Sequence, residues 1–533
     1  MNENDGDDAR TEKTRETTDG GDQGSTKASA KASTKRASTK RASTGKTTAK
    51  ATAGANGTAS TGTRKKTTTR KTTAKTATKA TAKSETVAEG EAVVTKPATR
   101  GSRSRRKAPA SEAPVTATAP APKPVLPDVL SADVLVIGGG LVGGTLACGL
   151  AQHGITVLVA EREDPAGWMS NAYDGRASAV ALGGQKVLEV LGLWPHMADA
   201  CQPINDIRIA DADAPLFMHY HRHEAGHEPM GYMAENLVTR RAIQARLAAL
   251  EYARLLAPVT VTGVTRDAHG AEACLKDGRR LRARLVVAAD GRASPTRVAA
   301  GLSTVGWDYD QAAIVLTVEH EVPHNGVAIE HFLPGGPFAT LPLTGNRSSI
   351  VWSERRDWVP ALMALPEDRF KAEFMTRFGD HFGDARFVGP RFSYPLSLQF
   401  AQRYTAQRLA LVGDAAHAMH PVAGQGMNYG LRDVAVLVEE LVKAHRLGLD
   451  VGAPATLARY ERLRRADNLL MLAATDGIVR LFSNDIGPLR LARTAGLAAV
   501  DRMGPLKRMF MRHAMGTFGI VGGVPRLMQG RAL

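Results

Sequence analysis

The stretch DVLVIGGGLVG, residues 133–143, decides how the ordered part of the chain is interpreted. Its first five residues, 133–137, are apolar after the initial Asp133, which is typical of a β-strand buried on both faces. The run leads into a G-x-G-x-x-G motif, an apolar helical stretch as far as His153, and a second apolar run at 155–159. The glycines of the motif are Gly138, Gly140 and Gly143. This order predicts a β-α-β unit of about 30 residues.

Each glycine of this motif has a physical role in such a unit. The first permits a tight turn, the second lets the backbone approach a pyrophosphate, and the third lets the helix pack closely on the strand. The helix N-terminus supplies N–H donors to the phosphates. Glu161 ends the second strand, 23 residues after Gly138, where an acidic residue binds a ribose 2′-hydroxyl and repels a 2′-phosphate. The motif therefore predicts an FAD or NAD site, without separating the two.

Three later segments carry further motif residues. VVAADGR at 286–292 and LALVGDAAH at 409–417 are apolar runs that each lead into a turn, and both read as buried strands. PVAGQGMN at 421–428 is a glycine-rich turn before a helix expected from about 427 to 445. The motif residues of these segments are Asp290, Gly291, Gly413, Asp414, Pro421, Gly424, Gln425, Gly426 and Asn428.

At these motifs the sequence resembles the FAD-dependent aromatic hydroxylases, the single-component flavoprotein monooxygenases related to p-hydroxybenzoate hydroxylase. The resemblance covers about residues 131–445 and includes the three family motifs in order. It implies that FAD is the cofactor and that a flavin 4a-hydroperoxide hydroxylates an electron-rich phenolic ring. Since we find no second dinucleotide-binding motif, either NAD(P)H binds transiently or a reductase partner donates electrons.

The resemblance also implies roles for the motif residues. Asp414 is expected to accept a hydrogen bond from a ribityl hydroxyl, and the turn 424–426 to bring bare backbone against the isoalloxazine ring. The helix after this turn directs its positive N-terminus at the ring. Pro421 is placed near the flavin face where dioxygen reacts. Residues 290–291 are assigned to a motif that serves both FAD and the incoming pyridine nucleotide.

Four more residues have two interpretations each. Arg176 matches the family arginine that lies along FAD, and otherwise forms a surface salt bridge. Asn236 matches a position that touches the cofactor, and otherwise caps a helix at 239–250. His417 and His420 invite an acid–base role, although structural or loop-orienting roles are commoner there. The histidines lack metal-ligand spacing, so no metal site is expected.

Within this superfamily, several stretches look more like the ubiquinone-biosynthesis hydroxylases. These stretches are 174–182, 188–194, 335–343, 351–353, 481–484 and 505–508. The likeness implies that the substrate is a polyprenylated phenol. A hydroxylase of a small soluble aromatic compound is the enzyme alternative.

Residues 305–355 change in character, because four short strands are expected at 312–321, 327–333, 338–343 and 348–353. They predict a mainly antiparallel sheet inserted into a Rossmann-like α/β domain, as a roof over the flavin ring. The expected domains are a tail and linker at 1–127, an FAD-binding domain at 128–304 and 401–446, a substrate-domain sheet at 305–400 and a helical region at 447–533.

Residues 455–533 read as helical, and the part at 502–515 mixes basic and apolar side chains. Because a polyprenylated phenol resides in a membrane, this part is a candidate for contact with an anionic lipid surface or a quinone-biosynthesis complex. The favoured alternative is a helix packed on the body of the protein. The sequence leaves the oligomeric state open.

The charge of the chain is concentrated in its N-terminal part. Residues 1–127 contain 26 Lys+Arg and 12 Asp+Glu, whereas the other 406 residues contain 43 and 41. The segment has no aromatic residue and one leucine, Leu126, so it is expected to be disordered. Its basic part at 23–83 resembles the tails of bacterial histone-like proteins, which contact phosphates. Weak nucleic-acid contact and a merely solubilising extension are both open.

The remaining features indicate a cytoplasmic protein. The chain has three cysteines, Cys148, Cys201 and Cys274, which fit neither a disulfide framework nor a zinc or iron–sulfur site. The polar, acidic start is unlike a secretory signal, and no window of about 18 apolar residues indicates a transmembrane helix.

Overall fold

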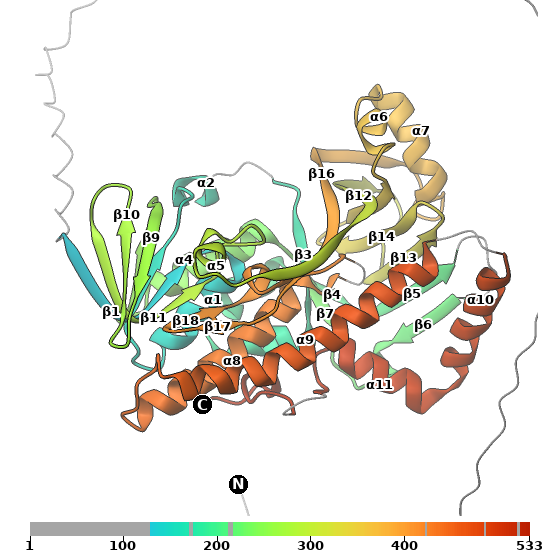
Figure 1. Cartoon of the computed structure of the whole chain (residues 1–533). Helices are drawn as coiled ribbons and strands as arrows, with labels where there is room; N and C mark the ends of the chain where they lie inside the picture. Colours follow the sequence, from blue (N-terminus) through green and yellow to red (C-terminus); the bar gives the residue numbers. More distant parts are fainter. Residues whose placement is uncertain (1–127, 170–173, 212–216, 422–423, 484–486, 520–522) are drawn as a thin grey trace, which may run out of the picture. The chain divides into compact units, whose positions relative to one another are not determined.

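The computed structural model describes residues 128–533 except for gaps at 170–173, 212–216, 422–423, 484–486 and 520–522. The segment 1–127, for which the composition predicts disorder, lies outside the described residues. The described residues form three β-sheets with flanking helices (Figure 1).

The first sheet contains the β-α-β unit that the sequence predicts. β1 (Val129–Ile137) pairs in parallel with β2 (Val157–Ala160) on one side and with β11 (Arg280–Ala288) on the other. α1 (Leu141–Ala151) joins β1 to β2 and is buried over most of its length. The other strands are β8 (Ala253–Leu256), β9 (Val261–Arg266), β10 (Ala271–Leu275), β17 (Thr405–Ala406) and β18 (Leu409–Leu411). The parallel order β18-β11-β1-β2-β8 confirms a Rossmann-like sheet.

α8 (Gly426–Arg446) returns to this sheet from far along the chain and packs against α1. Its bounds agree with the helix expected at about 427–445. Its apolar stripe is fully buried, because α8 lies between the first sheet and the C-terminal helices. The stripe consists of Leu431, Val434, Leu437, Val438 and Leu441.

The second sheet has the strand order β19-β16-β12-β15-β14-β13-β5-β6 and is mainly antiparallel. Its strands are β5 (Asp206–Asp211), β6 (Phe217–His221), β12 (Thr304–His320), β13 (Val327–Leu333), β14 (Gly336–Leu343), β15 (Arg347–Arg355), β16 (Ala385–Ala401) and β19 (His417–Ala418). The four expected strands are confirmed. The sequence missed the other four strands, β5, β6, β16 and β19. β5 and β6 precede the rest by about 100 residues and join the sheet through a parallel pairing of β5 with β13.

Helices cover one face of the second sheet, where α7 (Glu367–Phe378) contributes Phe370, Phe374 and Phe378 to a buried cluster with Trp352. α6 (Val359–Met363) precedes it. The opposite face is turned toward the C-terminal helices and borders the cavity described below.

The third sheet is small and has the order β3-β7-β4. Its strands are β3 (Ala177–Ala181), β4 (Gln202–Ile204) and β7 (Gly231–Glu235). The remaining short elements are α2 (Pro165–Met169), α3 (Leu182–Val190), α4 (Asn236–Ala248), α5 (Pro295–Ala299) and the 3-10 turns η1 (Trp194–His196), η2 (Ala198–Ala200), η3 (Arg222–Glu224) and η4 (Gly413–Ala415).

The C-terminal helices are α9 (Pro454–Phe482), α10 (Gly487–Arg502) and α11 (Gly504–Ala514), drawn in red in Figure 1. The expectation of helices throughout 455–533 is confirmed only as far as Ala514. Beyond it, the described residues contain one 3-10 turn, η6 (Leu527–Gln529). Among the described residues, no helix combines the length and the apolar character needed to cross a membrane.

Candidate active site

The turn after β1 can accommodate only glycine at two positions. Gly138 has φ +100°, and a Cβ atom there would lie 2.4 Å from the carbonyl oxygen of Ala289. A Cβ atom on Gly143 would lie 2.0 Å from the carbonyl oxygen of Gly138. Gly140 has nothing within 4 Å on its Cβ side, so a ligand can approach the backbone at the start of α1.

Glu161 faces this glycine turn. One of its carboxylate oxygens accepts a hydrogen bond from the backbone N–H of Gly139 at 2.6 Å, and the other accepts one from Glu163 at 2.7 Å. The side chain is buried at the end of β2, beside the predicted phosphate site. The structure thus holds the carboxylate in a fixed orientation at the place where the motif requires a ribose partner.

Asp290 shapes the loop after β11. Its carboxylate accepts hydrogen bonds from the hydroxyl of Ser294 at 2.5 Å and from the backbone N–H of Thr296 at 3.1 Å. Its backbone nitrogen lies beside Gly138. Gly291 has φ +82° and nothing within 4 Å on its Cβ side. Asp290 therefore orders the loop, and Gly291 leaves its surface open.

The turn at Gly413 and Asp414 lies against the start of α1. Gly413 has φ +58°, and a Cβ atom there would meet Val142 at 3.2 Å. The backbone N–H of Gly413 donates to the buried carboxylate of Asp433 at 2.9 Å. Asp414 keeps accessible surface, but many protein atoms surround its carboxyl, and this desolvation raises its pKa, while His417 and Arg292 lower it.

Gly424 and Asn428 belong to the glycine-rich turn before α8, which is the last of the predicted cofactor-binding segments. Gly424 has φ +60°, and a Cβ atom there would lie 2.9 Å from the side chain of Ala179 on β3. The Asn428 amide donates to the carbonyls of Ala179 and Gly424 at 2.9 and 3.2 Å, and its oxygen accepts from the N–H of Ala181 at 2.8 Å. Asn428 thus ties the glycine-rich turn to the third sheet.

The other residues of this turn lie around Gly424. Its N–H donates to the carbonyl of Pro421 at 2.9 Å. Gln425 is buried and lines a large cavity, whereas Gly426 is exposed at the first position of α8. Residues 422–423, between Pro421 and Gly424, lie outside the described part of the chain.

Arg176 and Asn236 lie next to each other at the edge of the third sheet. The N–H of Asn236 donates to the carbonyl of Arg176, and its side-chain oxygen accepts from the Ser178 hydroxyl at 2.7 Å. The alternative that Asn236 caps a helix is wrong, because Asn236 is the first residue of α4 and Glu235 occupies the N-cap position. Arg176 is ion-paired with Asp174 at 3.0 Å and remains partly exposed.

His417 and His420 have different surroundings. The Nε2 atom of His417 lies 2.6 Å from the carboxylate of Asp433, in a fully buried network that also contains Arg464. This contact supports a structural role for His417. His420 is buried beside the ring of Tyr309, and burial lowers its pKa to about 4, so it is neutral near pH 7.

A cavity of about 870 Å³ begins at the glycine-rich turn and continues between the second sheet and the C-terminal helices. Its lining is dominated by apolar side chains of β5, β6, β13 and α9 to α11. Examples are Ile207, Ile209, Met218, Phe332, Ile478 and Met511. A volume in the upper part of the usual ligand range of about 300–1,000 Å³ suits a large apolar ligand.

The cavity contains a buried acidic residue that the sequence reasoning did not identify. Glu330 lies on β13 among apolar neighbours, and burial raises its pKa to about 8. The only sequence signal is a glutamate at a buried position of an alternating strand, in VAIEHFL.

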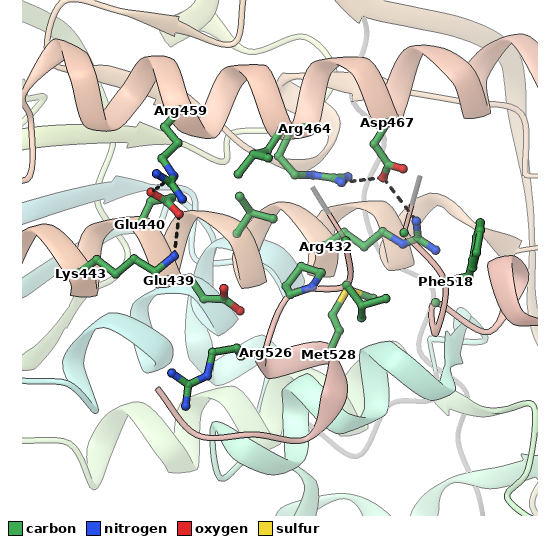
Figure 2. A pocket seen from close by; sticks show the side chains of 17 residues that line it. Arg432, Glu439, Glu440, Lys443, Arg459, Arg464, Asp467, Phe518, Arg526 and Met528 are labelled. Atoms are coloured by element: carbon green, nitrogen blue, oxygen red, sulfur yellow. Dashed lines mark hydrogen bonds and ion pairs between the residues drawn. The ribbon is translucent and has the colours of Figure 1, made fainter. Parts of the chain in front are cut away.

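A second pocket, of about 250 Å³, lies between α8, α9 and the residues after α11, and Figure 2 shows its charged side chains. Glu440 pairs with Lys443 at 2.9 Å and with Arg459 at 2.8 Å. Asp467 pairs with Arg464 at 2.7 Å. The pair of Glu440 with Arg459, and that of Arg432 with Asp467 at 3.3 Å, join α8 to α9 beside the pocket.

The residues fit an extended dinucleotide such as FAD. Glu161 and the first glycine turn lie at one end, Gly413 and Asp414 follow beside the start of α1, and the turn at Gly424 lies at the other end against β3. The sequence motifs from four distant segments therefore meet along one edge of the first sheet, where ligands bind in folds of this type.

Comparison with known proteins supports FAD as the cofactor of this domain. The family model described as "FAD binding domain" matches residues 131–472. Among curated proteins, "Ubiquinone hydroxylase UbiL" of Rhodospirillum rubrum is 62% identical over 399 residues, which cover 75% of this chain and 93% of that protein. The "3-demethoxyubiquinol 3-hydroxylase" of Escherichia coli is 35% identical over 388 residues, which cover 72% and 98%.

Solved structures show the same fold. The p-nitrophenol 4-monooxygenase PnpA from Pseudomonas putida aligns with a TM-score of 0.62 at 20% identity, covering 73% of this chain and 98% of that chain. At this identity the likeness concerns the fold alone.

Proposed function

The chain belongs to the FAD-dependent ubiquinone-biosynthesis hydroxylases, and on this basis we propose that it inserts one oxygen atom into the aromatic ring of a polyprenylated phenol. It is an FAD-dependent monooxygenase. The single observation that carries the choice of substrate is the apolar cavity of about 870 Å³ that starts at Gly424 and Gln425.

FAD, when bound, supplies the chemistry that activates dioxygen. Glu161 and the glycine turn after β1 would hold its ADP portion, and Asp414 its ribityl chain. Gly424 and Gly426 would let backbone approach the ring, with Pro421 beside the face where oxygen reacts. Asn428 fixes this turn on β3, so the turn that would contact the ring keeps its position beside the substrate cavity.

The cavity walls would exclude water from the reaction. Apolar side chains from the second sheet and from α9 to α11 surround the space next to Gln425. Exclusion of water would limit side reactions of the oxygen chemistry that FAD supplies. The same apolar walls would hold the aromatic ring of the substrate in a dry environment.

The electron donor is a separate part of the proposal. The described residues contain one strand–glycine–helix motif of the dinucleotide type, at β1 and α1. We propose that NAD(P)H binds transiently, or that a reductase partner delivers the electrons. Titrating the oxidised holoprotein anaerobically with NADH and NADPH distinguishes these donors by bleaching of the flavin.

The mouth of the cavity supports contact with a membrane surface, where a polyprenylated phenol would be collected. Exposed apolar side chains line the cavity at its outer end, and exposed arginines lie nearby on α10 and α11. The apolar rim consists of Leu470, Ile478, Leu481, Met509, Phe510 and Phe518, and the arginines are Arg502, Arg508 and Arg512. Lys507 does not contribute, because it is buried and paired with Glu224 and Asp501 at 2.9 Å.

For helix α11 we therefore propose both roles considered for residues 502–515: one face packs on the body of the protein, and the other contacts a membrane surface. Met511 and Lys507 pack on the body of the protein, while Met509 and Phe510 are exposed. Basic and apolar side chains on one exposed surface are typical of helices that lie on anionic lipid. Such a surface would also suit docking on a quinone-biosynthesis complex.

A deletion of the gene tests the substrate class. If the proposal is correct, cells without the gene accumulate a prenylated quinone precursor that lacks one ring oxygen, as measured by mass spectrometry of lipid extracts. An unchanged quinone pool, in a cell with no redundant hydroxylase, would instead favour the alternative substrate class of small soluble aromatic compounds.

A further inference from the structure

Glu330 occupies the middle of β13, on the face of the second sheet that borders the cavity. Ala328, Glu330 and Phe332 alternate with less buried residues, so the three side chains share one face. Across the sheet, Glu330 is in register with Ile209 on β5 and with Ala339 on β14. An acidic side chain therefore lies in an otherwise apolar wall.

Within the described part of the chain, the Glu330 carboxyl has no hydrogen bond or ion pair with protein groups, although the residue is only 9% exposed. A buried carboxyl without a partner is costly, because water no longer solvates it. Burial alone accounts for the rise of its pKa to about 8. The Glu330 carboxyl therefore does not stabilise the sheet.

The other titratable groups around the cavity leave Glu330 without a charged partner. Arg493 is ion-paired with Asp211 at 2.8 Å, so its charge is balanced. Burial raises the pKa of Tyr220 to about 12 and lowers the pKa of His513, so both are neutral near pH 7. A polar ligand group is the partner that this wall lacks.

The position of Glu330 relative to the flavin turn suits the head group of a substrate. Ala328 packs in a cluster with Ala179, and Ala179 lies directly beside Gly424. Glu330 is two residues further along β13, a separation of about 7 Å on a strand. It therefore lies between the flavin end of the cavity and the outer part near Phe332 and Phe482.

We propose that the carboxylate of Glu330 accepts a hydrogen bond from the phenolic hydroxyl of the substrate and thereby orients the aromatic ring in the cavity, an inference that rests on the proposed function. The hydrogen bond also increases electron density on the ring, which favours attack by an electrophilic oxygen. No atom of Glu330 is transferred, and the carboxylate is unchanged at the end of the cycle.

The test compares Glu330→Gln with the wild-type holoprotein, using 2-farnesylphenol and its methyl ether as probes. Binding is measured from the perturbation of the FAD spectrum, and hydroxylation in single turnovers of dithionite-reduced protein mixed with oxygen. In the wild type, affinity and rate for the phenol should rise with pH between 6 and 9. The ether, which has no hydroxyl to donate, should show no such rise.

Glu330→Gln should bind the phenol about 10–100-fold more weakly at pH 9, as expected for loss of a hydrogen bond to a charged group, and should lose the pH dependence. Its affinity for the ether should stay unchanged. Equal FAD content and an undiminished melting temperature exclude misfolding. Glu319→Gln, a change of a partly exposed glutamate on β12 of the same sheet, is the matched control and should behave as the wild type.

Two results would overturn the proposal, and they are distinguishable. If the wild type hydroxylates 2-farnesylphenol and Glu330→Gln keeps the same pH profile and the same preference for the phenol, the role of Glu330 is wrong while the proposed function stands. If the wild type neither binds nor hydroxylates the phenol, the proposed function fails, and the inference fails with it.

Discussion

The Nε2 atom of His417 lies 2.6 Å from the Oδ2 atom of Asp433, and the same carboxylate oxygen accepts a hydrogen bond from the backbone N–H of Gly413. Arg464 contacts the other oxygen at 2.8 Å. His417 and Arg464 hold the pKa of this buried carboxyl at about 2 despite burial, which acts in the opposite direction. Asp433 thus connects the turn that carries Asp414 to helix α9.

Replacing Asp433 should destabilise the protein and release FAD. Asp433→Ala removes one of the two carboxylates that pair with the buried guanidinium of Arg464, the other being Asp467, and this loss costs about 3 kcal/mol. It also removes the acceptor for Gly413, so the turn loses its position. Chemical unfolding and the ratio of flavin to protein measure both effects. Asp357→Ala, which breaks an exposed ion pair with Arg355, should change neither; equal behaviour of the two variants would contradict this account.

Gly143→Ala should impair FAD binding because the new Cβ atom would overlap the carbonyl oxygen of Gly138 at 2.0 Å. Relief of this contact requires α1 to move away from the turn, at a cost of about 1–3 kcal/mol. Gly263→Ala is the matched control, since nothing lies within 4 Å of its Cβ position. FAD content after purification should fall for the first variant only, and normal FAD content in Gly143→Ala would show that the turn tolerates displacement.

Glu330 should make stability depend on pH. Burial raises its pKa from 4.5 to about 8, so between these values the folded state keeps a proton that the unfolded chain has lost. Its contribution to stability is complete below about pH 4.5 and is lost as the pH rises toward 8, by up to about 1.4 kcal/mol per pH unit. The Glu330→Gln protein has no carboxyl at this position and should not show this decrease in stability.

The free energy of unfolding of Glu330→Gln should therefore exceed that of the wild type by an amount that grows between pH 5 and pH 8. Denaturant titrations of both proteins at each pH measure the difference, and all other titrating groups cancel in it. A constant difference would mean that the carboxyl is solvated in the folded protein.

The apolar rim of the cavity should govern binding to lipid. Replacing Met509 and Phe510 by serine should weaken binding to vesicles of phosphatidylglycerol and phosphatidylcholine by about tenfold or more per residue, as expected for burial of large apolar side chains. Leu447→Ser, at a fully separate exposed leucine after α8, should bind as the wild type. Co-sedimentation measures the affinity; retention of binding by the double variant would exclude this surface.

The basic segment should be separable from the flavoprotein. Deleting 1–127 should abolish any retention on nucleic acid and leave FAD content unchanged, because β1 begins at Val129. Loss of FAD on deletion would show that the proposed boundary of the FAD-binding domain at residue 128 is misplaced.

The sequence predicted those features of the site that depend on local chain geometry. Gly138, Gly143 and Glu161 follow directly from the strand–turn–helix pattern, because each role is set by neighbours a few residues away. Four of the eight strands of the inserted sheet, β12 to β15, were likewise predicted from alternation and turn residues. The resemblance supplied what spacing alone left open, the choice of FAD over NAD.

Features that depend on pairing across the chain were not predictable in the same way. β5 joins the second sheet through its register with β13, and the row that contains Glu330 and Ile209 exists only because of that pairing. The contact of Asp433 with Arg464 likewise depends on how α9 packs on α8. Nothing in the local sequence around either residue specifies its partner.

The most direct test of the central claim is a single turnover of the purified holoprotein with a polyprenylated phenol and isotopically labelled dioxygen. The flavin is reduced chemically, so the result does not depend on the natural electron donor. We predict a prenylated product that carries one labelled oxygen atom on its ring, while an unprenylated phenol reacts far more slowly. Formation of hydrogen peroxide with the prenylated phenol unchanged would contradict the account.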